Sequence, residues 1–96
     1  MARKISIGVL GAGGIALRKT IPALARAANC RVTAVMDVAD VGRIAQATGI
    51  AKAYDNEADL LADPDIDAVY IASPVGCHLR QIEAAAEAGK HILCEK

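Results

Sequence analysis

Aromatic residues are almost missing from this sequence of 96 residues, which has Tyr54 and Tyr70 but neither tryptophan nor phenylalanine. Its core must therefore be packed from Ala, Val, Ile and Leu, within an apolar content of 54%. No excess of one charge is present, because eleven basic residues balance eleven acidic ones. Without a basic stripe or aromatic rings to stack on bases, nucleic acid is not expected as a partner.

Long apolar runs are also absent from the sequence. None approaches the roughly 20 residues that span a bilayer, and glycines soon interrupt the apolar run after the basic start, so we expect neither membrane association nor a signal peptide. The cysteines Cys30, Cys77 and Cys94 form no Cys-x-x-C pair and have no metal-type spacing to the two histidines. We therefore expect no metal site, and three buried thiols in a reducing cytoplasm.

Short apolar segments rich in β-forming residues alternate with longer segments of helical period. Continuous apolarity is typical of strands covered on both faces, as in a parallel sheet. The expected strands are 5–10, 32–36, 51–54 (at an edge), 68–72 and 91–94, and the expected helices are 15–28, 41–48, 57–62 and 77–88. This order predicts one α/β domain over residues 1–96, a Rossmann-like doubly wound parallel sheet of about five strands.

Residues that start or stop helices support these boundaries. Asp40 is expected to cap the second helix with its side chain, and Gly49 to end that helix in a left-handed conformation. Asp63-Pro64 should stop the third helix, since the residue before proline avoids helical angles. Pro22 conflicts with an uninterrupted first helix. Either a kink just before Pro22 or a new helix that begins near it would remove the conflict.

A glycine-rich turn follows the first expected strand. Gly11, Gly13 and Ala16 form the pattern G-x-G-x-x-A, which is typical of dinucleotide-binding proteins. Gly11 permits a sharp turn, and Gly13 lets a pyrophosphate approach the backbone. Gly14 and Ile15 begin the next helix, whose free N–H groups and dipole attract phosphate. The pattern alone is common, but here the strand before it and the helix after it supply the required context.

The second strand ends in an acid at the place where such folds bind the adenosine ribose. Asp37 lies 24 residues past Gly13, and a carboxylate there accepts hydrogen bonds from ribose hydroxyls, each contributing about 1.5–3 kcal/mol. The next arginine along the chain is Arg43, so NAD is favoured over NADP. A nucleotide-dependent methyltransferase shares both features, and a plain turn followed by a solvated acid is the simpler alternative.

The second half of the chain separates these alternatives. It holds a Ser-Pro-x-x-x-His turn after the fourth strand, and an Ala-Gly-Lys-His run that leads to a Glu-Lys pair. These residues are Ser73, Pro74 and His78, residues 88–91, and Glu95 and Lys96. Together with the first turn and helix, these motifs resemble the N-terminal domain of the glucose–fructose oxidoreductase / inositol dehydrogenase family (Gfo/Idh/MocA). The family has Asn where this chain has Val75, which removes a polar contact.

The resemblance implies a cofactor site and a catalytic residue. The residues implied to bind the cofactor are Gly11, Gly13, Gly14, Ile15, Asp37, Ser73, Pro74, His78, Glu95 and Lys96. The glycine turn would hold the pyrophosphate, Asp37 the adenosine ribose and Glu95 the nicotinamide ribose. Lys96 would also face the substrate hydroxyl, as the catalytic residue. Considered without the resemblance, His78 is better explained by a structural role at the start of the fourth helix.

The resemblance further implies an enzyme, an oxidoreductase that transfers hydride between NAD (less favourably NADP) and a hydroxyl or ketone of a sugar, cyclic polyol or similar small molecule. A non-catalytic, NAD-sensing module of the same family is the alternative. In this family a second domain binds the substrate, so the chain is expected to be a fragment that is inactive alone. Its fifth strand would then be an exposed edge, which predicts self-association. A cytoplasmic location is expected.

Overall fold

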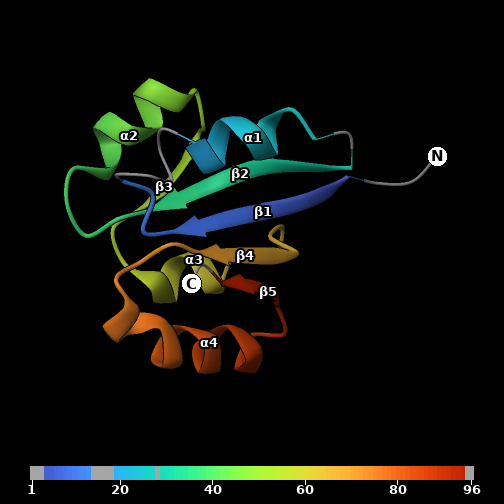
Figure 1. Ribbon diagram of the computed structural model, residues 1–96, viewed down its shortest axis with the longest axis vertical. Helices are drawn as coiled ribbons and strands as arrows, with labels where there is room; N and C mark the ends of the chain where they lie inside the picture. Colours follow the sequence, from blue (N-terminus) through green and yellow to red (C-terminus); the bar gives the residue numbers. More distant parts are fainter. Residues whose placement is uncertain (1–3, 14–18, 28, 95–96) are drawn as a thin grey trace.

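The sheet is the centre of the computed structural model, which describes residues 4–13, 19–27 and 29–94 (Figure 1). Its five strands are parallel and lie in the order β3-β2-β1-β4-β5. They are β1 (Ile5–Leu10), β2 (Cys30–Met36), β3 (Lys52–Tyr54), β4 (Ala68–Ile71) and β5 (His91–Cys94). The Rossmann-like parallel sheet is confirmed, and β3 lies at an edge as predicted.

Helices cover both faces of this sheet. They are α1 (Ile21–Ala25), α2 (Val41–Thr48), α3 (Glu57–Leu61) and α4 (His78–Glu87), with a 3-10 turn η2 (Val75–Cys77) in front of α4. α1 and α2 lie on one side of the sheet and α3 and α4 on the other (Figure 1). A right-handed crossover requires this arrangement, because the chain moves first toward β3 and then toward β5. The strand order therefore reverses between β1 and β4, which is the topological switch point.

Neighbouring residues of β1 point into two separate apolar layers. Val9 belongs to the layer that contains Ile44 of α2, whereas Leu10 belongs to the layer that contains Leu60 of α3 and Ile71 of β4. Val9 and Leu10 are both fully buried. Because both faces of the strand are covered, the apolar run is continuous rather than alternating, as the sequence indicated.

Helix ends follow the expected signals except at the start of α2. Gly49 ends α2 with a φ of 74°, and its N–H donates to the carbonyl of Ala45, which confirms the left-handed C-cap. Asp40 stands at the N-cap position, but its side chain makes no capping hydrogen bond. That prediction is wrong, because the carboxylate of Asp40 accepts a hydrogen bond from Nε of Arg43 at 2.9 Å.

The first helix ends at Ala25, before the predicted end at residue 28. Its α-helical part, α1, begins at Ile21, so Pro22 lies in the first turn of that part, where a missing N–H costs little. Lys19 and Thr20, just before it, already form a π-helical turn, and residues 14–18 lie outside the described part of the chain, so both alternatives for Pro22 stay predictions. α3 ends at Leu61, shortly before Asp63-Pro64, as expected.

The cysteines correct one expectation. Cys30 is buried, as predicted, but Cys77 is only partly buried and Cys94 is exposed. Within the described residues, no group of His, Cys, Asp and Glu side chains is arranged to hold a metal ion. No helix in the same residues is long and apolar enough to cross a membrane.

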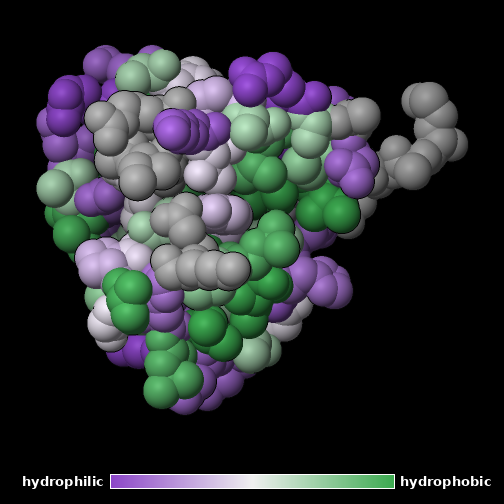
Figure 2. All heavy atoms as spheres, viewed as in Figure 1, coloured by the Kyte–Doolittle hydropathy of each residue, from purple (hydrophilic) through white to green (hydrophobic). Residues whose placement is uncertain are grey.

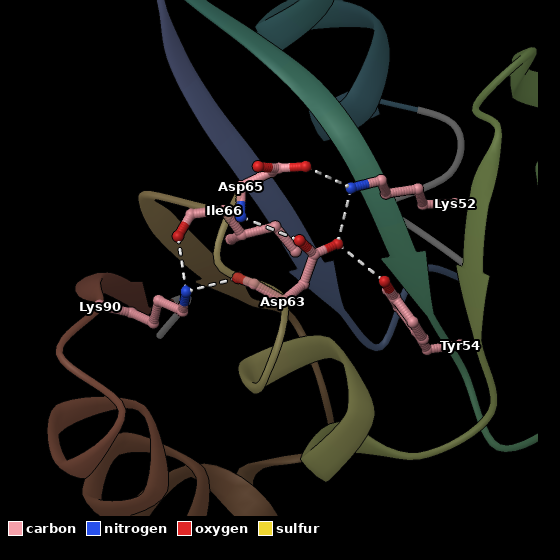
Figure 3. A network of polar contacts seen from close by, with 6 residues as sticks. All are labelled: Lys52, Tyr54, Asp63, Asp65, Ile66 and Lys90. Carbon is pink, nitrogen blue, oxygen red and sulfur yellow. Dashed lines mark hydrogen bonds and ion pairs between the residues drawn. The ribbon is translucent and has the colours of Figure 1, made fainter.

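A polar network lies at the amino ends of β3, β4 and β5 (Figure 3). At its centre the carboxylate of Asp63, which is 8% exposed, accepts hydrogen bonds from Nζ of Lys52 at 2.9 Å and Oη of Tyr54 at 2.7 Å. The N–H of Asp65 donates to its other oxygen at 2.9 Å. The hydrogen bond from Lys52, then that from Tyr54, lowers the pKa of the Asp63 carboxyl from 3.8 to about 2.

Lys90 extends the network to β5. Its Nζ donates to the main-chain carbonyls of Asp63 and Ile66, each at 2.7 Å. These carbonyls belong to the connection that leads into β4, so one ammonium group fixes the starts of β4 and β5 together. Lys90, the lysine of the Ala-Gly-Lys-His run, therefore makes a structural contact near the amino ends of the strands. The predicted site lies at the opposite, carboxyl ends.

Candidate functional site

The predicted site residues gather at the switch point, where the carboxyl ends of β1, β2 and β4 meet. Gly11 follows β1, Asp37 follows β2, and Ser73 comes shortly after β4. The N–H of Gly11 donates to the carbonyl of Met36 at 2.9 Å, next to Asp37. Three loops that are distant in sequence thus lie side by side because of the strand order.

Gly11 is required for two separate reasons. Its φ is 79°, a left-handed conformation that side chains with a Cβ rarely adopt. In addition, a Cβ on Gly11 would lie 2.7 Å from the backbone N, the Cα and the Oγ of Ser73. The sharp turn expected from the sequence is present, and its glycine also lets the β1 and β4 loops touch across the switch point.

Gly13 directly supports the carboxylate of Asp37. The N–H of Gly13 donates to Oδ2 of Asp37 at 3.0 Å. A Cβ on Gly13 would lie 3.2 Å from the same oxygen and 4.0 Å from Cδ1 of Ile44. The small size of Gly13 therefore makes room for Asp37, in addition to the approach of a pyrophosphate that the sequence predicts.

Asp37 is held in place and still has capacity for a ligand. Its Oδ1 accepts a hydrogen bond from the N–H of Ala39 at 3.0 Å, so each carboxylate oxygen has one partner from the main chain. Because a carboxylate oxygen can accept two hydrogen bonds, each keeps a place for a further donor. Asp37 is half-buried, and Val38 beside it is 84% exposed. The two hydroxyl groups of a ribose fit this acceptor pair.

The turn after β4 is closed by a histidine. Nε2 of His78 lies 2.6 Å from the carbonyl oxygen of Ser73; since a carbonyl only accepts, Nε2 carries the hydrogen. This contact joins the turn to the first residue of α4, in agreement with the structural role expected from the sequence alone. Pro74 is exposed and precedes η2, and Val75, where the family has Asn, is 72% exposed.

Four predicted site residues lie outside the described residues: Gly14, Ile15, Glu95 and Lys96. The phosphate-binding helix start and the catalytic lysine therefore stay predictions. Two contacts of the site were missed by sequence reasoning, namely the support of Asp37 by the N–H of Ala39 and the packing of Gly11 against Ser73. The second joins loops 62 residues apart and has no local pattern that could have indicated it.

Two hollows lie near the amino ends of the strands, away from the predicted site at their carboxyl ends. The larger, of about 640 Å³, is lined by residues near the amino ends of β2 and β3, such as Arg31 and Lys52. The smaller, of about 410 Å³, lies beside Lys90 and His91. None of the predicted cofactor-site residues that the structure describes lines either hollow, so neither hollow is evidence for or against that site.

A parallel sheet with a glycine turn after its first strand, and an acid at the end of the neighbouring strand, is the architecture of the Rossmann dinucleotide-binding domains. Comparison with known families agrees with this class. The chain belongs to the Gfo/Idh/MocA family, described as an oxidoreductase family with an NAD-binding Rossmann fold, which its residues 5–96 match. The resemblance noted in the sequence is thereby confirmed.

Relatives of the chain include a named dehydrogenase and a named reductase, both for sugars. D-xylose 1-dehydrogenase (NADP(+)) 2 of Haloferax volcanii is 42% identical over 90 residues, which are 93% of this chain and 28% of that protein. A dTDP-3,4-didehydro-2,6-dideoxy-alpha-D-glucose 3-reductase of Streptomyces antibioticus is 43% identical over 95 residues, 97% of this chain and 29% of the reductase.

A solved structure of a related enzyme has the same fold over nearly the whole of this chain. The scyllo-inositol dehydrogenase of Lactobacillus casei, with bound NAD(H) and scyllo-inositol, superimposes with a TM-score of 0.89 at 32% identity, over 98% of this chain and 28% of that one. The chain therefore spans less than a third of the length of the relatives that it matches.

Proposed function

We propose that this chain is the nicotinamide-dinucleotide-binding domain of an oxidoreductase that acts on a hydroxyl or ketone of a sugar, cyclic polyol or similar small molecule. The observation that carries the proposal is the carboxylate of Asp37. It is fixed by the N–H groups of Gly13 and Ala39 and retains acceptor capacity on both oxygens. The named relatives support the substrate class, since their names refer to xylose, a dTDP-sugar and scyllo-inositol.

NAD is the proposed cofactor. A 2′-phosphate close to the carboxylate of Asp37 would be repelled by roughly 1–4 kcal/mol per pair of unit charges at about 4 Å. Relatives that are named with NADP and with NAD(H) belong to the same fold, so the preference depends on the residues around the ribose. In this chain Asp37 follows β2, and the next arginine along the sequence is Arg43.

The bound nicotinamide would accept or donate the hydride, and the side chains of this protein would bind and orient the reactants. Asp37 would hold the adenosine ribose, and the turn closed by Ser73 and His78 would border the cofactor on the β4 side. Lys96, whose role rests on the family resemblance, would stabilise negative charge on the substrate oxygen and help to place its proton. Relatives named as dehydrogenases and reductases favour this enzyme over a non-catalytic sensor.

Calorimetric titration with NAD, NADP and S-adenosylmethionine tests the proposal. We expect the tightest binding for NAD, and we expect Asp37→Ala to weaken it by roughly tenfold or more, because charge-assisted hydrogen bonds to the ribose are lost. Glu87→Ala is the matched control, since Glu87 is an exposed acid at the far end of α4. Preferential binding of S-adenosylmethionine, or no binding of either dinucleotide, would refute the proposed function.

A further inference from the structure

Asp40 and Arg43 form an ion pair at the start of α2, shortly after Asp37 in the chain. We propose that Asp40 determines cofactor specificity: it holds the guanidinium of Arg43 in an ion pair and places a second negative charge near the ribose, so that the chain rejects a 2′-phosphate. This inference rests on the proposed function, because it concerns which dinucleotide binds at Asp37.

The position of the pair follows from the packing of α2. The N–H groups of Arg43 and Ile44 lie 3.2 and 3.4 Å from the carbonyl oxygen of Asp40, so these residues form one compact turn. Cδ1 of Ile44 lies 4.0 Å from the place where a Cβ on Gly13 would stand. Gly13 in turn donates to the carboxylate of Asp37. Ala39, next to Asp40, donates its N–H to the other oxygen of Asp37, so the turn that carries the pair adjoins the residues of the ribose site.

The charges around the site disfavour a phosphate. Arg43, the basic residue of this turn, has its Nε 2.9 Å from Oδ2 of Asp40, and the carboxylate of Asp37 adds a second negative charge shortly before it in the chain. Arg43 is the first basic residue after Asp37 in the sequence. An arginine near the ribose acid is the usual partner for a 2′-phosphate, since guanidinium pairs readily with phosphate oxygens. Here that arginine is already paired, although both side chains are solvent-accessible (79% and 63%).

Asp40 can be removed without straining the backbone. Its φ of 39° is in the left-handed region, where glycine is more stable than an acidic residue. Glycine is also an acceptable residue at a helix N-cap, and the side chain of Asp40 makes no capping hydrogen bond. Asp40→Gly should therefore fold, and Asp40→Asn provides a second variant because Asn tolerates the same conformation.

The test compares NADP with NAD by calorimetry at low ionic strength, in the unaltered chain and in both Asp40 variants. We expect NADP affinity to rise by about fivefold in Asp40→Gly, the upper range for an exposed ion pair, with NAD affinity changed by less than about twofold. The double variant Asp40→Gly/Arg43→Ala should lose the part of the gain that comes from the released guanidinium and keep only the part that comes from the lost negative charge. Glu87→Gln, which removes one charge far from the site, should leave the ratio unchanged.

The outcomes separate this inference from the function on which it rests. If NAD binds normally and neither Asp40 variant changes the ratio of NADP to NAD affinity, only the role of Asp40 is refuted. A gain that is undiminished when Arg43 is also replaced would likewise overturn the ion-pair account. If the unaltered chain binds neither dinucleotide, the proposed function fails, and this inference fails with it.

Discussion

Gly11 has a left-handed backbone and lies too close to Ser73 for a Cβ atom. Each of these two features by itself disfavours every residue other than glycine at this position. Gly11→Ala should destabilise the chain by roughly 2–4 kcal/mol, because it adds conformational strain to overpacking against backbone atoms. Urea denaturation monitored by circular dichroism measures the loss in unfolding free energy.

Two other glycines separate these causes. Gly49 has a positive φ of 74° but open space around its Cβ position, so Gly49→Ala measures strain alone, about 1 kcal/mol. Gly76 has open space and no positive φ, so Gly76→Ala should change the unfolding free energy by less than about 0.5 kcal/mol. Equal effects at Gly11 and Gly49 would show that the contact with Ser73 does not matter.

At the scale of single residues, sequence reasoning succeeded where the chemistry is local. The left-handed Gly11 and Gly49 follow from the turns that they make. It failed at Asp40, because Arg43 competes with the helix N–H groups for the same carboxylate. The contact between Gly11 and Ser73 depends on how two distant loops pack, and no pattern within either loop contains that information.

Among the elements, the connection between α3 and β4 depends most on ionised groups. The pKa of Asp63 is about 2 in the folded chain, against an ordinary value of 3.8. A lowered pKa contributes stability that is fully present above about pH 4 and is lost as the pH falls through 2, since the unfolded state then binds more protons. We expect Asp63→Asn to lower the unfolding free energy at pH 6 by on the order of 1–2 kcal/mol.

Urea unfolding between pH 6 and pH 2 measures this effect. The loss of stability on acidification should be shallower in Asp63→Asn than in the unaltered chain, because the group responsible is gone. Asp55→Asn, which alters an exposed acid after β3, serves as the control and should keep the original slope. An unchanged slope in Asp63→Asn would contradict the ionised network drawn in Figure 3.

Strands were easier to predict than their exact pairing. Continuous apolar runs gave the strands and their order of appearance, but β2 begins at Cys30 rather than at residue 32, because Cys30 pairs with Ile5. The register between β1 and β2 also shifts after Ile7, and no residue in either strand signals that irregularity. The ends of α2, α3 and α4 were predicted within one residue, whereas α1 ends at Ala25, three residues before the predicted end, with no sequence signal.

On the scale of the whole molecule, apolar surface is unevenly distributed. On the face drawn in Figure 2, hydrophobic side chains gather in the lower half of the view, over the region of α4, β4 and β5. Large exposed apolar residues of these elements and of η2 are Val75, Leu79 and Leu93, at 72%, 70% and 53% exposure. Self-association, which the sequence analysis expected, stays a prediction.

Cofactor binding should stabilise the whole domain, because the proposed site joins loops from three strands. NAD at about 100 times its dissociation constant should add about 2.7 kcal/mol to the unfolding free energy. For a domain of this size, the melting temperature should then rise by roughly 10 °C or more. Differential scanning calorimetry with and without NAD measures the shift, with adenosine as a control that lacks the pyrophosphate. An unchanged melting temperature in the presence of bound NAD would contradict a site that links these loops.

The contact between Gly11 and Ser73 has a consequence for recombination among members of the family. A chimera with its crossover point anywhere between these two residues takes the β1 loop from one parent and the β4 loop from the other. The two loops of such a hybrid come from different parents and have not been selected to fit each other. They must nevertheless pack so closely that no methyl group fits between Gly11 and Ser73. Gene shuffling should therefore treat both loops as one inheritable unit, although Gly11 and Ser73 are 62 positions apart in the sequence.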